Sequence, residues 1–411
     1  MKKRLISLVA AAALVGGISV ASAPAAKAGN VTVKGDTQVQ LYGFIKATFA
    51  WDKQMTGDPD HSNMPNYKGK TQLSKDTYDK INYDGYSGIT RLGLKFKNAD
   101  ANLVGGIEAG FHESGDTLRL RRAYIQHNLD NFYVLIGKEW ILEDMFTSIT
   151  AGFDSPAGFN EAIARVPEVK VGTNLDLGSA NLDLALAFES GSKSAVTDGD
   201  FDGGDGKYAL EVTRVIMPYP AARAVLNFET GFGAPATAYV WGSLIPVKVS
   251  DKNDGAYKSD DSETSYAVGV GLKVPVSMVT VGLNYQYSKG ATGYAGVDDY
   301  TPASYYYVNG DVEETKMNAF EANVVVSPMP CVSVGAEYDF VEFKNDEAFD
   351  DNKPKVHTYL ANVKIKTTKY TTLTLEWRHV KAKKFNALPG VGTDDDDFSG
   401  DQFYATYVYT F

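Results

Sequence analysis

The chain has 411 residues, one cysteine, a net charge of −11 and an aromatic content of 12%. A single cysteine excludes a disulfide-bonded scaffold. The acidic balance makes nucleic acid a poor partner, because basic residues are needed to neutralise phosphates. Length alone would allow two or three soluble domains, but no change of composition marks a linker, so one domain is expected after the N-terminal segment.

The first 28 residues have the pattern of a cleaved signal peptide. A basic stretch, MKKRL, precedes an Ala-rich apolar run that ends in the small-x-small sequence AKA at 26–28. A cut after Ala23 would place Pro24 beside it, which disfavours that position. An uncleaved anchor would need an apolar run of about 20 residues, and the run here is shorter. We therefore expect export, with residues 29–411 as the mature chain.

Apolar residues alternate with polar residues along the mature chain, and this period of two predicts β-strands. Each strand has one apolar face and one face of amide and charged side chains. A soluble sandwich, with its polar face in water, would show the same alternation. The segments in chain order include 39–52, 89–96, 118–129, 132–140, 266–274, 279–288, 318–326, 332–340, 371–378 and the aromatic QFYATYVYTF at 402–411.

Short and long connections alternate between these strands. Short ones, such as 98–101 and 275–278, follow long ones, such as 53–85 and 191–219. Short periplasmic turns and long external loops are typical of outer-membrane barrels, and strands in lipid must close into a ring because open edges cannot be satisfied there. The fold class is therefore all-β: a closed antiparallel transmembrane β-barrel of sixteen strands, or of eighteen if 207–218 forms a separate hairpin. Strand 402–411 closes the ring against strand 39–52, and a barrel of this size leaves an aqueous lumen.

The segments LYGFIKATFAWD (41–52), ITRLGLKF (89–96) and LRLRRAYIQHNLDNFYVLIGKEW (118–140), together with Phe411, resemble the trimeric general porins of the Gram-negative outer membrane. Within that superfamily the nearest branch is the DcaP-like, dicarboxylate-type porins. The resemblance covers the first five strands and the tail, and elsewhere only the architecture matches. It implies a homotrimer in lipid and lipopolysaccharide, no cofactor, and recognition of the terminal Phe411 by the outer-membrane assembly machinery. It also implies that the third external loop, 142–164, folds into the lumen as the constriction.

Strand parity assigns several basic side chains to the lumen, where rings of charge set the selectivity of a pore. Leu92, Leu94 and Phe96 take the outer face of their strand, so their basic neighbours point inward. Arg119 and Arg121 share a face, with Arg122 on the other. The alternative is a structural role in the headgroup region or against loop carboxylates. The expected basic wall of the constriction comprises Lys46, Arg91, Lys95, Arg119 and Arg121.

An acidic face opposite this wall is expected from loop 142–164, which carries Glu143, Asp144, Asp154 and Glu161. The other external loops are also acidic and would favour cations at low salt, but screening acts over about 8 Å at physiological ionic strength. The shielded constriction is expected to dominate. The sequence therefore predicts a weak anion preference, and the resemblance adds small carboxylates as cargo.

The outward faces of the first strands are unusually small. Gly43, Ala47, Gly105 and Ala109 lie there and suit a close protein contact between trimer subunits, with ordinary lipid exposure as the alternative.

Other motifs are weak. Asp198, Asp200 and Asp202 match the first half of a calcium loop, but Ala209 stands where the pattern requires a bidentate Glu, so a solvated acidic loop is favoured and no metal site is assigned. The five histidines show no HExxH spacing and no nucleophile or phosphate motif is present, so the chain is not expected to be an enzyme.

The function expected from the sequence is an outer-membrane porin that lets small hydrophilic solutes and ions diffuse passively. The alternative is a structural or adhesive surface barrel that works through its acidic external loops.

Overall fold

The computed structural model describes residues 31–34, 37–53, 80–84, 90–111, 118–143, 148–149, 165–190, 207–209, 211–215, 218–232, 234–250, 261–295, 302–308, 311–349, 352–384 and 397–411. Within these ranges, helical structure is limited to η3 (Thr292–Ala295), and no helix is long and apolar enough to cross a membrane.

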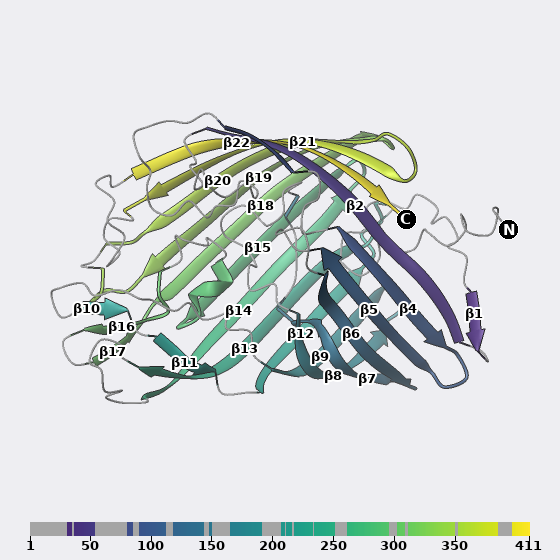
Figure 1. Ribbon diagram of the computed structural model, residues 1–411, viewed down its shortest axis with the longest axis horizontal. Helices are drawn as coiled ribbons and strands as arrows, with labels where there is room; N and C mark the ends of the chain where they lie inside the picture. Colours follow the sequence, from purple (N-terminus) through teal and green to yellow (C-terminus); the bar gives the residue numbers. More distant parts are fainter. Residues whose placement is uncertain are drawn as a thin grey trace.

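Sixteen antiparallel strands form a closed barrel, as the sequence predicted (Figure 1). Each strand pairs with the next around the ring, and the last pairs with the first between Phe44–Lys53 and Asp401–Thr410. The strands are β2 (Thr37–Lys53), β4 (Arg91–Asn98), β5 (Leu103–Phe111), β6 (Leu118–Leu129), β7 (Phe132–Trp140), β8 (Arg165–Asp176), β9 (Ala180–Glu189), β12 (Tyr219–Phe228), β13 (Ala236–Ser250), β14 (Asp261–Val276), β15 (Val279–Lys289), β18 (Lys316–Met329), β19 (Val332–Lys344), β20 (Lys355–Lys366), β21 (Thr371–Lys383) and β22 (Asp397–Thr410).

Segment 207–218 does not add a hairpin to the ring, which settles the strand count at sixteen. Its β11 (Glu211–Val215) pairs with the end of β13, beyond the part of β13 that pairs with β12. Two other short strands, β1 (Val31–Lys34) and β3 (Lys80–Asp84), pair with opposite ends of β2.

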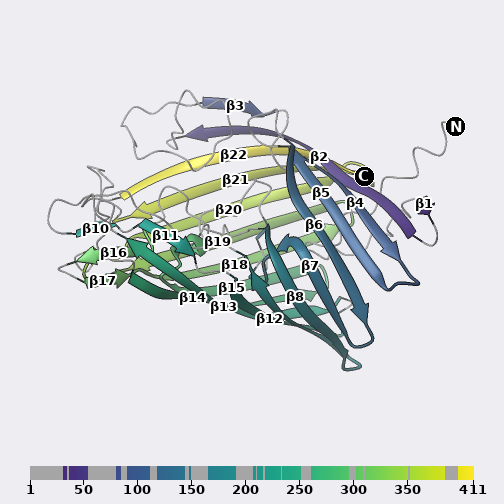
Figure 2. The ribbon, with the colours of Figure 1, turned by 60° about the horizontal axis from the view of Figure 1, so that its bottom comes forward.

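The long connections 191–219 and 289–314 contain regular structure that the sequence analysis did not predict. Strands β10 (Lys207–Ala209), β16 (Tyr305–Val308) and β17 (Asp311–Glu314) form a separate three-stranded sheet. Figure 2 shows this sheet at the end of the barrel opposite the C-terminus. Tyr305 and Tyr306 are fully buried and hold it in place, since their burial offsets the ordering of the loops.

The barrel is apolar outside and polar inside, which confirms the predicted parity. On β22, Phe403 and Tyr407 are 43% and 44% exposed, whereas Thr406 between them is 2% exposed. On β19, Val334 is 46% exposed and Asp339 is 0% exposed. Soluble proteins place polar and apolar side chains the other way round, and this arrangement is that of a barrel whose outer face contacts lipid.

The terminal strand is fixed to the first strand by backbone hydrogen bonds. Phe411 N donates to Gly43 O at 3.0 Å, and Gly43 N donates to Phe411 O at 3.3 Å. The predicted closure of the ring by the aromatic tail is therefore confirmed, with Phe403, Tyr407 and Tyr409 on the lipid side.

Apolar side chains also fill part of the lumen at the end that carries the long loops. The inward positions of β13, β18, β19 and β20 change there from polar to apolar, as at Val341 and Phe343. The three-stranded sheet and Phe349 pack against them in one cluster. The described residues therefore form an apolar cluster inside the barrel at this end.

Candidate functional site: the wall and loop of the lumen

Glu108 on β5 lies at the centre of the basic wall. Its Oε1 accepts a hydrogen bond from Arg121 Nε at 3.1 Å and lies 3.8 Å from Arg91 Nη1. Its Oε2 accepts from the Tyr42 hydroxyl at 3.2 Å. Because the carboxylate is 4% exposed, it neutralises these cations in a region of low dielectric, where charge interactions are strong.

A β-bulge decides which arginines face the lumen. Glu108 pairs with Arg122, but Ala109 pairs with Leu120, so Arg121 is an extra residue in β6. Both Arg121 and Arg122 therefore point inward, and the prediction that Arg122 takes the opposite face from Arg121 is wrong. Gly110 makes room for the extra side chain, because a Cβ there would lie 2.6 Å from Arg121 Cδ.

Arg122 forms a bidentate ion pair within the wall. Its Nε and Nη2 donate to the two oxygens of Glu139 at 2.6 and 2.5 Å, a bidentate geometry. The guanidinium also lies 5.2 Å from the ring centre of Tyr124. Arg122, Glu139 and Glu108 were all missed by the sequence analysis. Alternation along the strand could have predicted the position of Glu108, since Ile107 and Ala109 face outward and Glu108 therefore faces the lumen.

The remaining predicted basic residues also lie on this wall. Lys46 is 6% exposed on β2, and Lys95 lies 5.3 Å from the ring of Tyr42. Arg119 pairs in register with the inward-facing Gly110 and forms no hydrogen bond or ion pair with a described residue. Six basic side chains thus gather here around two carboxylates. Their roles in a constriction stay a prediction.

The loop after β7 reaches the far wall of the barrel. Ser148 Oγ donates to Glu337 Oε1 at 2.6 Å, and Ile149 N donates to Glu337 Oε2 at 2.7 Å. Asn362 Nδ2 donates to Ile149 O at 2.7 Å. Since β7 is the fifth strand of the ring and β19 the thirteenth of sixteen, these contacts span the lumen.

Of the four loop carboxylates predicted to face the basic wall, Glu143 is described and lies elsewhere. It is 1% exposed and within electrostatic range of Glu189 on β9 and Tyr219 on β12. Glu189 also accepts a hydrogen bond from Leu142 N at 2.8 Å, which fixes the start of the loop. Asp144, Asp154 and Glu161 lie outside the described residues.

The wall to which the loop is anchored is acidic, a feature the sequence analysis did not assign. Glu321, Glu337 and Asp339 face inward from β18 and β19, and Glu376 does so from β21. Arg378 Nη2 donates to Glu376 Oε1 at 3.2 Å. The lumen is therefore bordered by a mainly basic wall at β2–β6 and a mainly acidic wall at β18–β21.

The small residues predicted for a subunit contact do face outward. Gly43 and Ala109 are register partners of Leu92, which is 45% exposed. Gly105 on β5 and Ala47 on β2 lie on the same outward face of their strands.

The candidate calcium ligands Asp198, Asp200 and Asp202 lie outside the described residues. Within the described ranges, no group of three acidic, His or Cys side chains could hold a metal ion.

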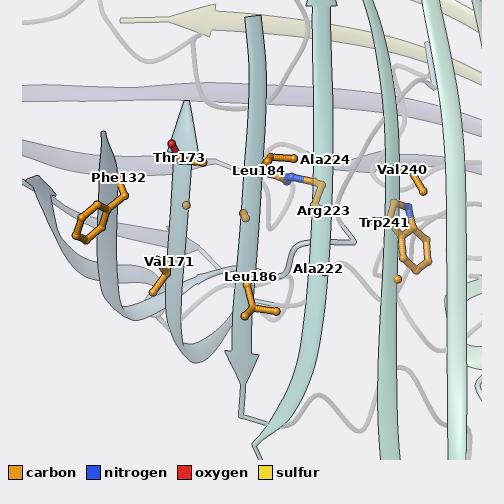
Figure 3. A pocket seen from close by; sticks show the side chains of 13 residues that line it. Phe132, Val171, Thr173, Leu184, Leu186, Ala222, Arg223, Ala224, Val240 and Trp241 are labelled. Atoms are coloured by element: carbon orange, nitrogen blue, oxygen red, sulfur yellow. The ribbon is translucent and has the colours of Figure 1, made fainter. Parts of the chain in front are cut away.

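A hollow of about 640 Å³ lies on the outer face of β7, β8, β9, β12 and β13 (Figure 3). Exposed apolar side chains such as Val171, Leu186 and Val240 border it, and the small Ala222 and Ala224 form its floor. Because it opens to the lipid side, it is separate from the lumen and is not part of a solute path.

Solved structures share this fold. The chain is similar to the outer membrane channel DcaP of Acinetobacter baumannii, with 20% identity over 93% of this chain and 99% of that chain and a TM-score of 0.68. It is similar to in-vitro folded OmpT of Vibrio cholerae in its trimer form, with 12% identity, coverage of 92% and 100%, and a TM-score of 0.56. It is also similar to an anion-selective porin from Comamonas acidovorans, with 14% identity over 91% of this chain and 100% of that chain and a TM-score of 0.54.

No protein-family model matches the chain, and no curated protein matches its sequence. At these identities the structural likeness shows the fold, which is that of outer-membrane porins, as the resemblance in the first strands had indicated.

Proposed function

We propose that the protein is a porin of the Gram-negative outer membrane that lets small hydrophilic solutes and ions diffuse passively. The observation that carries the proposal is the loop anchored across the lumen on Glu337 and Asn362 while six basic side chains line the wall at β2–β6. A narrowed passage with opposite charge on its two sides orients and sorts charged solutes, because field lines concentrate between low-dielectric walls.

The aqueous path runs along the basic wall. Buried apolar side chains and the three-stranded sheet pack inside the barrel at the loop end, from the start of β8 round to β21. Water and ions therefore pass on the side of β2–β6. Solutes there meet Arg91, Arg119 and Arg121 before the acidic wall behind the loop. This favours a weak preference for anions, with small carboxylates as candidate cargo since arginine binds carboxylate groups well.

The working assembly is a homotrimer in which Gly43, Ala47, Gly105 and Ala109 lie at the subunit contact. The support is their outward orientation and small size, together with the trimer form of the structural neighbour OmpT. The signal peptide 1–28 directs export, and the aromatic C-terminus at Phe411 serves as the assembly signal. Neither a cofactor nor catalysis is part of this function.

The test is a planar-bilayer recording of the purified trimer under a KCl gradient. Current steps that close in threes, with a reversal potential of the anion-selective sign, are the expected result. A cation-selective sign would mean that the acidic loops control permeation. Well-folded, heat-modifiable protein that gives no current would instead favour a structural or adhesive barrel, which works through its external loops.

A further inference from the structure

Two lysines face the lumen from the side of the barrel opposite the basic wall, near the end that carries the short turns. Lys273 on β14 is the register partner of Gly282 on β15, and Leu272 beside it is 37% exposed on the outer face. Lys364 on β20 is the register partner of Thr374 on β21, which is buried in the lumen. Side chains alternate between the two faces of a strand, so both lysines point inward.

The ammonium groups of Lys273 and Lys364 lie within electrostatic range of each other. Three strands, β15, β18 and β19, separate β14 from β20 in the ring (Figure 1). Four strand spacings of about 4.8 Å place the two backbones at least about 19 Å apart along the wall. The two long side chains therefore extend toward each other across the concave inner face.

Lys364 lies just beyond the anchored loop, toward the short-turn end of the barrel. Asn362, which donates to Ile149 O at 2.7 Å, is the previous inward position on β20. The strand ends two residues after Lys364, at Lys366. A solute that has passed the loop from the external side therefore meets the lysine pair before it leaves the lumen.

The carboxylates within electrostatic range of Lys364 are engaged elsewhere. Glu337 accepts two hydrogen bonds from the anchored loop, and Glu376 accepts one from Arg378 at 3.2 Å. Neither lysine of the pair forms an ion pair with a residue that the structure describes. Like charges at short range disfavour each other, so an anion that binds between the two ammonium groups relieves a repulsion.

We propose that Lys273 and Lys364 form a second anion site of the channel, which takes divalent oxyanions. A lysine ammonium is a compact point charge, whereas the arginine fork matches a planar carboxylate. Two converging ammonium groups therefore suit a compact group that carries two negative charges. The inference rests on the proposed passive channel. It gives a permeating anion one station on the basic wall and a second on the opposite side, each weak enough to release it.

The first experiment records chloride current through single trimers and adds sulfate, an anion that stays divalent at neutral pH. The test variant is Lys273→Gln/Lys364→Gln, and Lys273→Arg/Lys364→Arg keeps both charges. The matched control is Lys316→Gln/Lys344→Gln, which removes the same charge from the outer face of β18 and β19. Acetate is the monovalent comparison, and heat modifiability shows that each variant is folded.

Sulfate should block the wild type, the arginine variant and the control at the same concentration. The glutamine variant should need about 30-fold more sulfate, because two unit charges are lost at contact distance in water. Acetate should block each protein far less than sulfate does. The proposal fails if the glutamine variant is blocked as readily as the wild type, if the control shifts equally, or if acetate matches sulfate.

The second experiment needs no current. Crystals of the full-length mature wild type and of the glutamine variant are soaked in selenate, whose anomalous scattering locates the anion. A peak between the two Nζ atoms in the wild type that is lost in the variant supports the site, even if the protein does not conduct. A peak missing from the wild type, or kept in the variant, overturns the site, while a measured current would leave the proposed channel standing.

Discussion

Glu108→Gln removes one negative charge from the basic wall and keeps the shape of the side chain. In the native protein the carboxylate contacts Arg121 at 3.1 Å, Tyr42 at 3.2 Å and Arg91 at 3.8 Å. The glutamine still accepts a hydrogen bond, but it no longer offsets the charge of the arginines. The wall becomes more positive by one unit, so the preference for anions should rise whatever its starting value.

The size of the change follows from Coulomb's law. One unit charge acting over about 8 Å contributes about 0.5 kcal/mol in water and about 2 kcal/mol at an effective dielectric constant of about 20. These energies correspond to changes of about 2-fold and about 30-fold in a permeability ratio. The lumen lies between the two limits, since its wall is protein and its path is water.

The assay is the reversal potential of single trimers under a KCl gradient, compared with that of the wild type. Glu342→Gln is the matched control, because it makes the same chemical change on the outer face, beside Lys355. The reasoning fails if Glu108→Gln leaves the reversal potential unchanged or moves it toward cations. It fails equally if Glu342→Gln produces the same shift.

Three further changes separate the parts of the site. Arg119→Gln should move the reversal potential toward cations without loss of stability. Arg122→Gln breaks a buried pair with Glu139 and should destabilise the barrel by about 3–5 kcal/mol. The change in stability is measured as the temperature at which heat-modified protein appears on a gel. Glu337→Ala removes both acceptors that hold Ser148 and Ile149, so open-channel current noise should increase; unchanged noise would mean that the loop is held by other contacts. Ala109→Arg should prevent trimer formation, as measured by native electrophoresis. Ala224→Arg, which lies on the outer face at the lipid-side hollow, should still form trimers. If both variants form trimers, the subunit contact lies elsewhere.

The charged residues of the site were only partly accessible from the sequence. Alternation alone placed Lys46, Arg91, Lys95, Arg119 and Arg121 on the lumen side. The register agrees for the first four, and the hydrogen bond to Glu108 places Arg121 there. Arg122 was placed wrongly, because one extra residue in a strand reverses the phase of every position after it. A bulge depends on the pairing of two strands, and nothing in the strand's own composition marks it.

Contacts between residues on opposite sides of the lumen could not be predicted from the sequence for a different reason. Ser148 and Glu337 are 189 positions apart in the chain, and they meet because eight strands of ring closure bring β19 opposite β7. The acidic wall at β18–β21 has the same origin. Its residues are on separate strands, and each looks like an ordinary polar position until the register aligns them.

By itself the sequence determined the closed barrel, the inward and outward faces of its strands, the short turns at one end, and closure through the aromatic tail. These features follow from local periodicity and from the rule that no strand edge can stay open in lipid. The tertiary structure decided the rest: the count of sixteen strands, the contacts around Glu108, the bulge at Arg121 and the loop anchored on Glu337. Each depends on which residues of different strands share a row, and that is set by cross-strand register, which one strand's pattern does not contain.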